Sequence, residues 1–289
     1  MNATKLFSFL LITILFLTNT FAQDFITAKE FVALQKEKPN LVIIDASKDK
    51  LYAAAHIEGA VNIPYATLNE KDAKVEGTML PLESVAKILG SKGISNEDTI
   101  VVYDEGSQKY ATLEYWTLKY LGAKDVKVLH KEMNAFRDAR VKLTSEAPSV
   151  KAKTFSVNLV PEINADAAYV ESAIGKADVV IIDARTPDEF NGVRNETSTY
   201  SNGHIKGAIN IPYESIVMTG TNNFISPEEF KKLAGMELSP EKTYILYCRT
   251  GIKGATLYAY MTNVLAFKNV KNYKGAYLDW DHLGKPIVK

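Results

Sequence analysis

The chain has 289 residues, of which 46% are hydrophobic and 24% are charged, a composition typical of a globular protein with a substantial core. Its length favours two domains. The 34 basic and 34 acidic residues balance, so no strong field would attract the chain to nucleic acid or to an anionic membrane. With one cysteine, Cys248, an intrachain disulfide is excluded, and the folded state must depend on apolar burial.

The first 22 residues are predicted to be a secretory signal peptide rather than part of the fold. Lys5 precedes a mainly apolar run at 6–17, and the small residues Thr20 and Ala22 lie before the expected cleavage site. The run is shorter than the ~20 residues that span a bilayer, which argues against a membrane anchor. The mature chain is expected to begin near Gln23 and to be exported, either periplasmic or secreted, without stable membrane insertion.

A long internal repeat predicts two similar domains. Residues 41–65 (LVIIDASKDKLYAAAHIEGAVNIPY) resemble 179–213, and residues 99–116 (TIVVYDEGSQKYATLEYW) align without gaps to 243–260 (TYILYCRTGIKGATLYAY). The offset is 138 residues in the first pair and 144 in the second, which is the size of a whole domain rather than of a short structural repeat. The expected units are a domain over 23–139, a linker over 140–162 and a domain over 163–289.

Each copy has the pattern of an α/β domain. The elements predicted in the two copies are, in chain order, a helix (27–37 and 164–175), a strand (41–44 and 179–182), the motif HI-x-GA-x-NIP, a helix, a second strand (100–103 and 244–247), a loop and a long amphipathic helix (255–265 in the second copy). The uninterrupted Val and Ile runs are typical of strands buried on both faces. Strands that alternate with helices predict a mostly parallel sheet flanked by helices in each domain.

Cys248 lies where such a sheet would carry its chemistry. Functional groups in open α/β sheets lie beyond the carboxyl ends of the strands, and Cys248 directly follows one of these ends. In the loop CRTGIKG, Gly251 can adopt positive φ, and successive backbone N–H groups can form an anion-binding nest before the next helix. Arg249 and Lys253 would add positive charge at the rim. A lone cysteine is more often a small buried apolar residue, but this setting would stabilise a thiolate.

Two anion chemistries could use this loop. A cysteine phosphatase needs the pattern Cys-x5-Arg, whose arginine clamps the phosphoryl oxygens, and here the sixth residue after Cys248 is Gly254. The alternative is sulfur transfer, in which the thiolate attacks a sulfane sulfur and becomes a persulfide. A cradle of N–H groups would stabilise the persulfide anion without an arginine clamp.

The motifs DAR…GHIKGAINIP and YCRTGIKGA together resemble the rhodanese (thiosulfate sulfurtransferase) family, and the repeat resembles its tandem-domain members over about 25–285. The resemblance implies two rhodanese-like domains, a persulfide on Cys248, thiosulfate or 3-mercaptopyruvate as the donor, and cyanide or a thiol as the acceptor. It also implies an inactive first domain. In the gapless repeat Asp104 stands in the place of Cys248, and the surrounding DEGSQ is acidic where the second loop is basic.

The resemblance further implies a set of substrate-binding residues. In the family the loop after the cysteine holds the donor, and here it consists of Arg249, Thr250, Gly251, Ile252 and Lys253. The cationic second position is nearer to the thiosulfate enzymes than to the Cys-Gly-Ser/Ala-Gly loop of the mercaptopyruvate enzymes. Thr250 stands where a lysine is frequent, and Glu189 stands where the family has another substrate arginine. Arg185 and Arg194 are the candidates to replace that arginine.

Other conspicuous residues are expected to be structural. His56, His204, Asp45 and Asp183 recur in both copies, including the one without a cysteine. The aromatic residues Tyr273, Tyr277 and Trp280 are expected to pack in the core. Four histidines and one cysteine form no metal-site spacing, and no nucleotide fingerprint is present, so no cofactor is expected.

Three functions stay open from the sequence. The leading hypothesis is a sulfurtransferase that acts on a small-molecule sulfur donor and a thiophilic acceptor, as a monomer. The second is a non-catalytic rhodanese-like module that binds a partner or senses oxidants through Cys248, because oxidising compartments favour thiol oxidation. The third, a phosphatase, is the weakest because the arginine clamp is missing.

Overall fold

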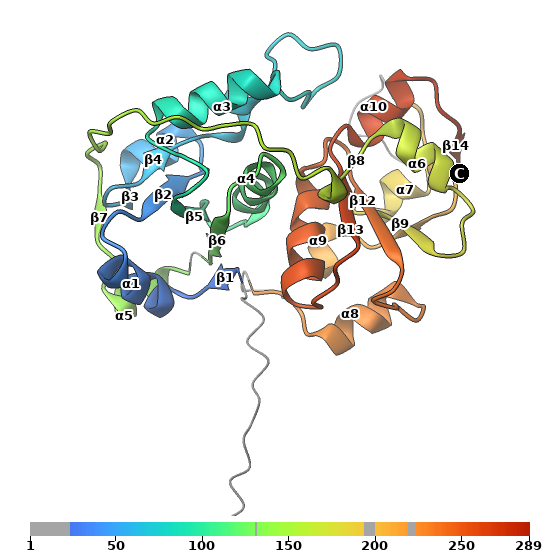
Figure 1. Cartoon of the computed structure of the whole chain (residues 1–289). Helices are drawn as coiled ribbons and strands as arrows, with labels where there is room; N and C mark the ends of the chain where they lie inside the picture. Colours follow the sequence, from blue (N-terminus) through green and yellow to red (C-terminus); the bar gives the residue numbers. More distant parts are fainter. Residues whose placement is uncertain (1–23, 131, 194–199, 219–222) are drawn as a thin grey trace, which may run out of the picture.

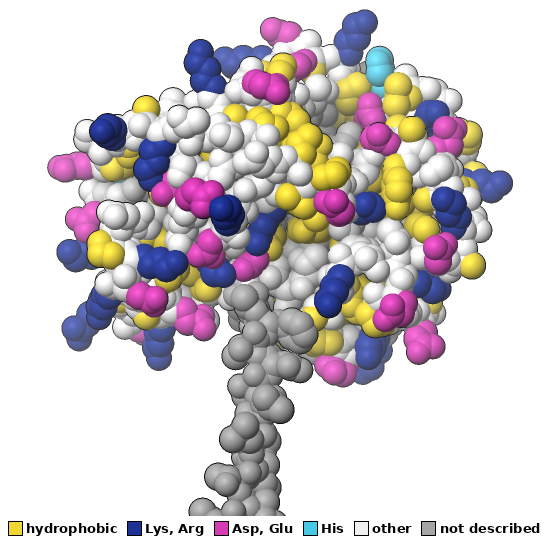
Figure 2. All heavy atoms as spheres, in the orientation of Figure 1, with side chains coloured by type: hydrophobic (Ala, Val, Ile, Leu, Met, Phe, Trp, Pro, Cys, Tyr) yellow, Lys and Arg dark blue, Asp and Glu magenta, His cyan; other side chains and the backbone are white. Residues whose placement is uncertain are grey.

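The computed structural model describes residues 24–130, 132–193, 200–218 and 223–289. The predicted signal peptide lies outside these residues. The described chain forms two lobes that lie side by side (Figure 1). Acidic and basic side chains are interspersed over the face shown in Figure 2, as the balanced charge predicts. Across the described ranges, no helix combines the length and apolarity that crossing a membrane would require.

The first lobe contains one large sheet and the helices around it. Its strands are β1 (Phe25–Ile26), β2 (Val42–Asp45), β3 (His56–Ile57), β4 (Val61–Asn62), β5 (Thr99–Tyr103), β6 (Asp125–Leu129) and β7 (Leu143–Thr144). Its helices are α1 (Ala28–Glu37), α2 (Asp49–Ala54), η1 (Tyr65–Leu68), α3 (Leu82–Ser91), α4 (Lys109–Tyr120) and α5 (Met133–Ala139).

The second lobe repeats this plan. Its strands are β8 (Asn164–Ala165), β9 (Val179–Asp183), β10 (His204–Ile205), β11 (Ala208–Asn210), β12 (Thr243–Tyr247), β13 (Val270–Tyr273) and β14 (Ile287–Val288). Its helices are η2 (Pro161–Ile163), α6 (Ala167–Ala173), α7 (Pro187–Phe190), η3 (Tyr213–Ser215), α8 (Pro227–Ala234), α9 (Ile252–Asn263) and α10 (Ala276–His282).

The two large sheets have the same topology. Their strand orders are β1-β6-β5-β2-β4 and β8-β13-β12-β9-β11, and every pair in both sheets is parallel. Two short antiparallel pairs, β3 with β7 and β10 with β14, lie outside them. The prediction of two α/β domains with mostly parallel sheets flanked by helices is confirmed. In both domains the strand that ends just before the repeat position of Asp104 and Cys248, β5 or β12, lies at the centre of the sheet.

The predicted element bounds hold better for strands than for helices. The central strands begin and end within one residue of their predicted positions. α9, however, begins at Ile252, three residues before the predicted start, because Gly251 is its N-cap in the left-handed conformation, with φ 84°. The helix predicted over 164–175 is shorter as well, since residues 164 and 165 belong to the edge strand β8.

The helices α4 and α9 are not amphipathic, so that expectation is wrong. All residues from 111 to 118 of α4 and from 254 to 261 of α9 are buried. Each helix packs on its own sheet with one side and on the other helix with the opposite side (Figure 1). A helix covered on both sides has no solvent-facing polar side, and even Thr112, Glu114 and Thr117 of α4 are buried.

One apolar cluster runs through both domains. It contains side chains of β5 and α4 in the first domain and of β12 and α9 in the second. The outer face of the first sheet packs on α1 and α5, and that of the second sheet packs on α6 and α10. The molecule is therefore layered, with α4 and α9 at its centre, and the hydroxyls of Thr112 and Thr256 hydrogen-bond across this central contact at 2.9 Å.

The segment between the domains lies along the first domain in an extended course (Figure 1). The N–H of Lys153 donates to the carbonyl of Gly90, and the N–H of Asn158 donates to the carbonyl of Leu121. A Cβ at Gly90 would lie 2.5 Å from the Lys153 carbonyl oxygen, so glycine permits the close approach. The linker is thus held to α3 and α4 by backbone hydrogen bonds.

Candidate active site

Cys248 lies at the carboxyl end of the central strand β12 and lines a small cavity. Its side chain is 3% exposed, and its carbonyl accepts a hydrogen bond from the N–H of Tyr277 at 3.0 Å. The cavity has a volume of about 160 Å³, well below the ~300–1,000 Å³ of sites for drug-sized ligands. A compact molecule is therefore the kind of ligand that it fits.

Residues from both domains line this cavity. They are Glu76, Lys109 and Tyr110 from the first domain and Arg185, Glu189, Cys248, Arg249, Thr250, Ile252 and Lys253 from the second. Most of the sequence-predicted site residues are thus brought together, and Gly251 caps α9 directly behind them. Arg194 lies outside the described residues. The sequence reasoning missed Glu76, Lys109 and Tyr110, because nothing local to their positions shows that they face the other domain.

Gly251 is required by its surroundings as well as by its backbone angle. A Cβ at this position would lie 2.7 Å from the carbonyl oxygen of Lys274, so a larger residue would displace the loop. At the offset of 144 its counterpart in the first domain is Ser107, and the left-handed N-cap of α4 is the next residue, Gln108, with φ 61°. Each loop thus ends on a left-handed residue before its helix begins, but this residue comes one position later in the first copy of the repeat than in the second.

The corresponding loop of the first domain holds an anion with backbone N–H groups. The carboxylate of Asp104 accepts hydrogen bonds from the N–H groups of Gly106, Gln108, Tyr110 and Ala111 at 2.8–3.3 Å. These residues correspond, at the offset of 144, to residues 250, 252, 254 and 255 of the second domain. An anion is thus held by backbone N–H groups at the position that Cys248 occupies in the other copy.

The two cations predicted for the rim are both paired with carboxylates. Arg249 forms an ion pair with Glu76 of the first domain, and the Nζ of Lys253 lies 2.7 Å from a carboxylate oxygen of Glu214. Burial alone would lower the pKa of Lys253, but the hydrogen bond and the charge of Glu214 outweigh it and raise this pKa. The rim is therefore less positive than the sequence of the loop indicates.

Lys274 lies behind the loop and joins it to the first domain. Its Nζ donates to the carbonyl of Gly77 at 2.6 Å and to that of Thr250 at 3.4 Å. Burial lowers its pKa to about 8, against the opposing effect of the Cys248 charge. The neighbouring loop of the first domain is thereby held against the loop that carries Cys248.

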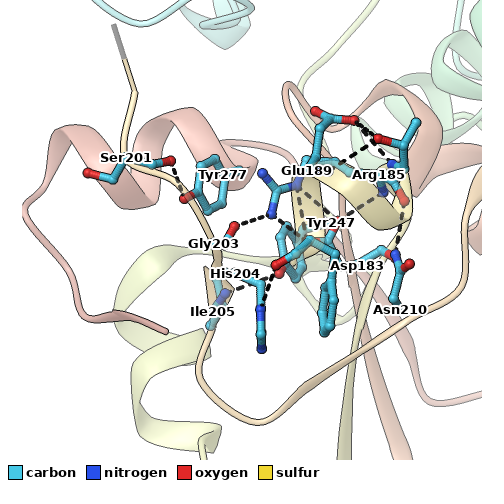
Figure 3. A network of polar contacts seen from close by, with 12 residues as sticks. Asp183, Arg185, Glu189, Ser201, Gly203, His204, Ile205, Asn210, Tyr247 and Tyr277 are labelled. Carbon is cyan, nitrogen blue, oxygen red and sulfur yellow. Dashed lines mark hydrogen bonds and ion pairs between the residues drawn. The ribbon is translucent and has the colours of Figure 1, made fainter. Parts of the chain in front are cut away.

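Arg185 lines the cavity, but its guanidinium group is already bound. Its Nε and Nη2 donate to the Asp183 carboxylate at 2.7–3.1 Å, and Nη2 also donates to the carbonyl of Gly203 at 2.7 Å (Figure 3). The ring of Tyr277 stacks on the guanidinium at 3.7 Å, and the residue is 2% exposed. A substrate role for Arg185 stays a prediction, since these contacts alone account for its burial.

Glu189 has a structural partner as well. Its carboxylate accepts from the N–H and the hydroxyl of Thr186 at 3.1 and 2.9 Å and so completes a capping box at the start of α7. This contact explains why a carboxylate stands at a position where an arginine would be expected to bind substrate.

The repeated residues have matching geometry in the two domains. His56 stacks on Tyr52 and His204 stacks on Phe190, each with ring centroids 3.7 Å apart, in positions away from the cavity. The asparagine of each NIP motif also repeats its role, because Asn210 donates to the carbonyls of Asp183 and Arg185 at 2.9 Å, and Asn62 does the same for the equivalent pair. These contacts shape the loops after β2 and β9.

Comparisons with known proteins agree on one family. Residues 27–139 and 166–283 each match the family model described as the rhodanese-like domain. A thiosulfate sulfurtransferase of Corynebacterium glutamicum is 28% identical over 272 residues, which cover 89% of this chain and 88% of that protein.

Solved structures show the same fold. The SseA protein of Escherichia coli, described with the rhodanese fold and the mechanism of 3-mercaptopyruvate sulfotransferases, is 26% identical, with a TM-score of 0.74 over 88% of this chain and 98% of that chain. The Tum1 protein of Saccharomyces cerevisiae is 21% identical, with a TM-score of 0.81 over 92% of this chain and 98% of that chain.

Proposed function

Because the chain belongs to the rhodanese family, we propose that it moves a sulfane sulfur from a small donor to a thiophilic acceptor through a persulfide on Cys248. Sulfur transfer as the general activity is supported by the relatives. The observation that carries the proposal is the place of Cys248, at the carboxyl end of β12 and facing a compact cavity. The corresponding loop of the first domain surrounds the Asp104 carboxylate with backbone N–H groups.

The reaction takes place in two steps. The Cys248 thiolate attacks the outer sulfur of thiosulfate, a new S–S bond forms, and the old S–S bond breaks so that sulfite leaves with its electron pair. Cyanide or a thiolate then attacks the outer sulfur of the persulfide, and thiocyanate or a new persulfide leaves while Cys248 returns as a thiolate. The N–H groups of the loop stabilise the anionic sulfur in both states.

Thiosulfate is the donor that we favour over 3-mercaptopyruvate. The second residue of the loop is Arg249, and Lys253 follows in the first turn of α9. Both cations are paired with carboxylates, Glu76 and Glu214, so the small cavity volume, which suits a compact dianion, is the stronger argument for thiosulfate. A comparison of kcat/KM for the two donors tests this choice, and a higher value for 3-mercaptopyruvate would contradict it.

The persulfide is tested by intact mass. After treatment with thiosulfate and removal of the excess, the protein is expected to gain the mass of one sulfur atom, and cyanide is expected to remove it. Cys248→Ser is expected to gain no mass, because the chain has no other cysteine. If thiosulfate and 3-mercaptopyruvate both left the mass of the reduced protein unchanged, the proposal would be wrong.

Steady turnover distinguishes the proposed sulfurtransferase from a non-catalytic binding or redox-sensing module. A binding or redox-sensing module would exchange one sulfur or one oxidising equivalent at Cys248 without steady transfer to cyanide. Continuous formation of thiocyanate under reducing conditions is expected instead. Hydrolysis of an aryl phosphate, which would indicate a phosphatase, is not expected.

We also propose that the protein is exported, with its leader removed after Ala22. The support is the charged and apolar pattern of 1–22. N-terminal sequencing of the protein from its native host tests this, and a mature chain that still begins with residue 1 would contradict it. The mature protein is expected to act on small molecules as a monomer.

A further inference from the structure

Lys109 is the first residue of α4 and belongs to the domain without a cysteine, yet it lines the cavity of Cys248. Its Nζ lies 6.0 Å from the ring centroid of Tyr110 and 5.8 Å from that of Tyr213. Tyr213 belongs to the second domain, and its hydroxyl donates to the carbonyl of Ser107 at 2.6 Å. The ammonium group thus lies within cation–π distance of two aromatic rings, one from each domain.

The internal repeat explains why a lysine of the first domain reaches this place. At the offset of 144, Lys109 is the counterpart of Lys253, and Thr112 is the counterpart of Thr256. The two threonines touch each other, so the domains are related by an approximate two-fold axis near this contact. Equivalent residues close to the axis lie on opposite sides of the same space, and the Nζ of Lys253 is also 6.0 Å from the Tyr213 ring.

The other cations that line the cavity have carboxylate partners. Arg185 is paired with Asp183, Arg249 with Glu76 and Lys253 with Glu214. Among the residues that the structure describes, no carboxylate lies within ion-pair distance of the Lys109 ammonium group. An anion that enters the cavity would have to compete with Glu76 or Glu214 for the other rim charges, whereas Lys109 offers its charge without the loss of an ion pair.

We propose that Lys109 is the cation that binds the oxyanion end of the sulfur donor, so that the first domain supplies a substrate-binding residue to the active site of the second. The ligand class is a compact sulfur–oxygen anion such as thiosulfate. This inference rests on the proposed function. Lys109 contributes to ground-state binding of the donor, and the transfer of sulfur to Cys248 does not depend on it.

The test is a kinetic comparison of full-length variants with thiosulfate varied at saturating cyanide. Lys109→Ala is expected to raise KM for thiosulfate about tenfold and to change kcat by less than about twofold, as expected for the loss of uniform binding. Lys109→Arg, which keeps the charge, is expected to restore most of the affinity. Lys87→Ala removes an exposed lysine of α3 and is the matched control, with an unchanged KM.

A second variant separates Lys109 from the alternative cation. Glu76→Gln removes the partner of Arg249. If Glu76→Gln lowered KM about tenfold while Lys109→Ala left it unchanged, Arg249 would be the donor-binding cation and the inference would be wrong. Sulfur uptake by the wild-type protein, measured by intact mass, distinguishes a failure of this inference from a failure of the proposed function. Normal uptake with an unchanged KM in Lys109→Ala overturns this inference alone, whereas no uptake by the wild-type protein overturns the proposed function and this inference with it.

Discussion

Asp104 and Cys248 occupy the same position of the repeat and stabilise their loops differently. Asp104 is 2% exposed and accepts hydrogen bonds from four backbone N–H groups and from the Ser107 hydroxyl. Without that carboxylate these buried donors would lose their partner, and each buried unsatisfied donor has a desolvation cost. The loop of the first domain therefore depends on its side chain for stability, whereas the loop of the second domain has a cysteine in place of that carboxylate.

We expect Asp104→Ala to lower the free energy of unfolding by about 3 kcal/mol, because several charge-assisted hydrogen bonds are lost together. Cys248→Ala, at the equivalent position, should cost about 1 kcal/mol, since it removes one small buried group. Urea unfolding followed by circular dichroism measures both. Equal losses would mean that Asp104 does not hold its loop in the way that the hydrogen bonds indicate.

At the scale of elements, the packing of the central helices α4 and α9 explains how an ionisable side chain comes to be buried. α4 and α9 pack on each other and on both sheets, so even a charged residue of α4 can be buried. Glu114 is 2% exposed, and burial raises its pKa from 4.5 to about 8. It is thus protonated at neutral pH in the folded protein and ionised in the unfolded chain.

This difference gives α4 a pH-dependent effect on stability. Between about pH 4.5 and pH 8 the folded protein holds a proton on Glu114 that the unfolded chain has lost, so stability falls as the pH rises through this window. Glu114→Gln is neutral at every pH, and its stability is expected to fall less between pH 5 and pH 9, by a few kcal/mol. Urea midpoints at pH 5, 7 and 9 measure this, with the exposed Glu83→Gln as control. Parallel curves for the Glu114→Gln variant and the wild-type protein would contradict the expectation.

At the scale of the whole molecule, the two domains share one continuous apolar cluster. The linker adds backbone hydrogen bonds along α3 and α4, and the loop around Gly77 is held to the second domain by Lys274. Separation of the domains would expose α4 and α9, whose residues are buried on all sides. The cavity at Cys248 would also lose the wall that Glu76, Lys109 and Tyr110 provide.

We therefore expect both domains to unfold in a single cooperative transition. The chain has two tryptophans, of which Trp116 lies in α4 and Trp280 in α10. In the Trp280→Phe variant, tryptophan fluorescence reports on the first domain through Trp116. In the Trp116→Phe variant, it reports on the second domain through Trp280. In each variant the fluorescence midpoint in urea should coincide with that of circular dichroism, which follows both domains. A biphasic dichroism curve would show that the domains unfold independently.

The sequence by itself determined the duplication, the central strands and the position of Cys248 at a strand end. These depend on local patterns: runs of Val and Ile that must be buried on both faces, and a loop whose glycine follows the cysteine by three residues. The loss of the nucleophile from the first domain was visible for the same reason, because a gapless repeat places Asp104 against Cys248.

Only the tertiary structure decided what surrounds the cysteine. Arg249 was predicted as a rim charge, but its partner Glu76 is 173 residues away, and Lys109 was not identified because the first domain was expected to be inert. The burial of α4 and α9 on all sides likewise follows from a partner helix in the other domain. Whether a charge is free and which faces of a helix are covered depend on segments far apart in the chain, and these meet only after both domains have packed.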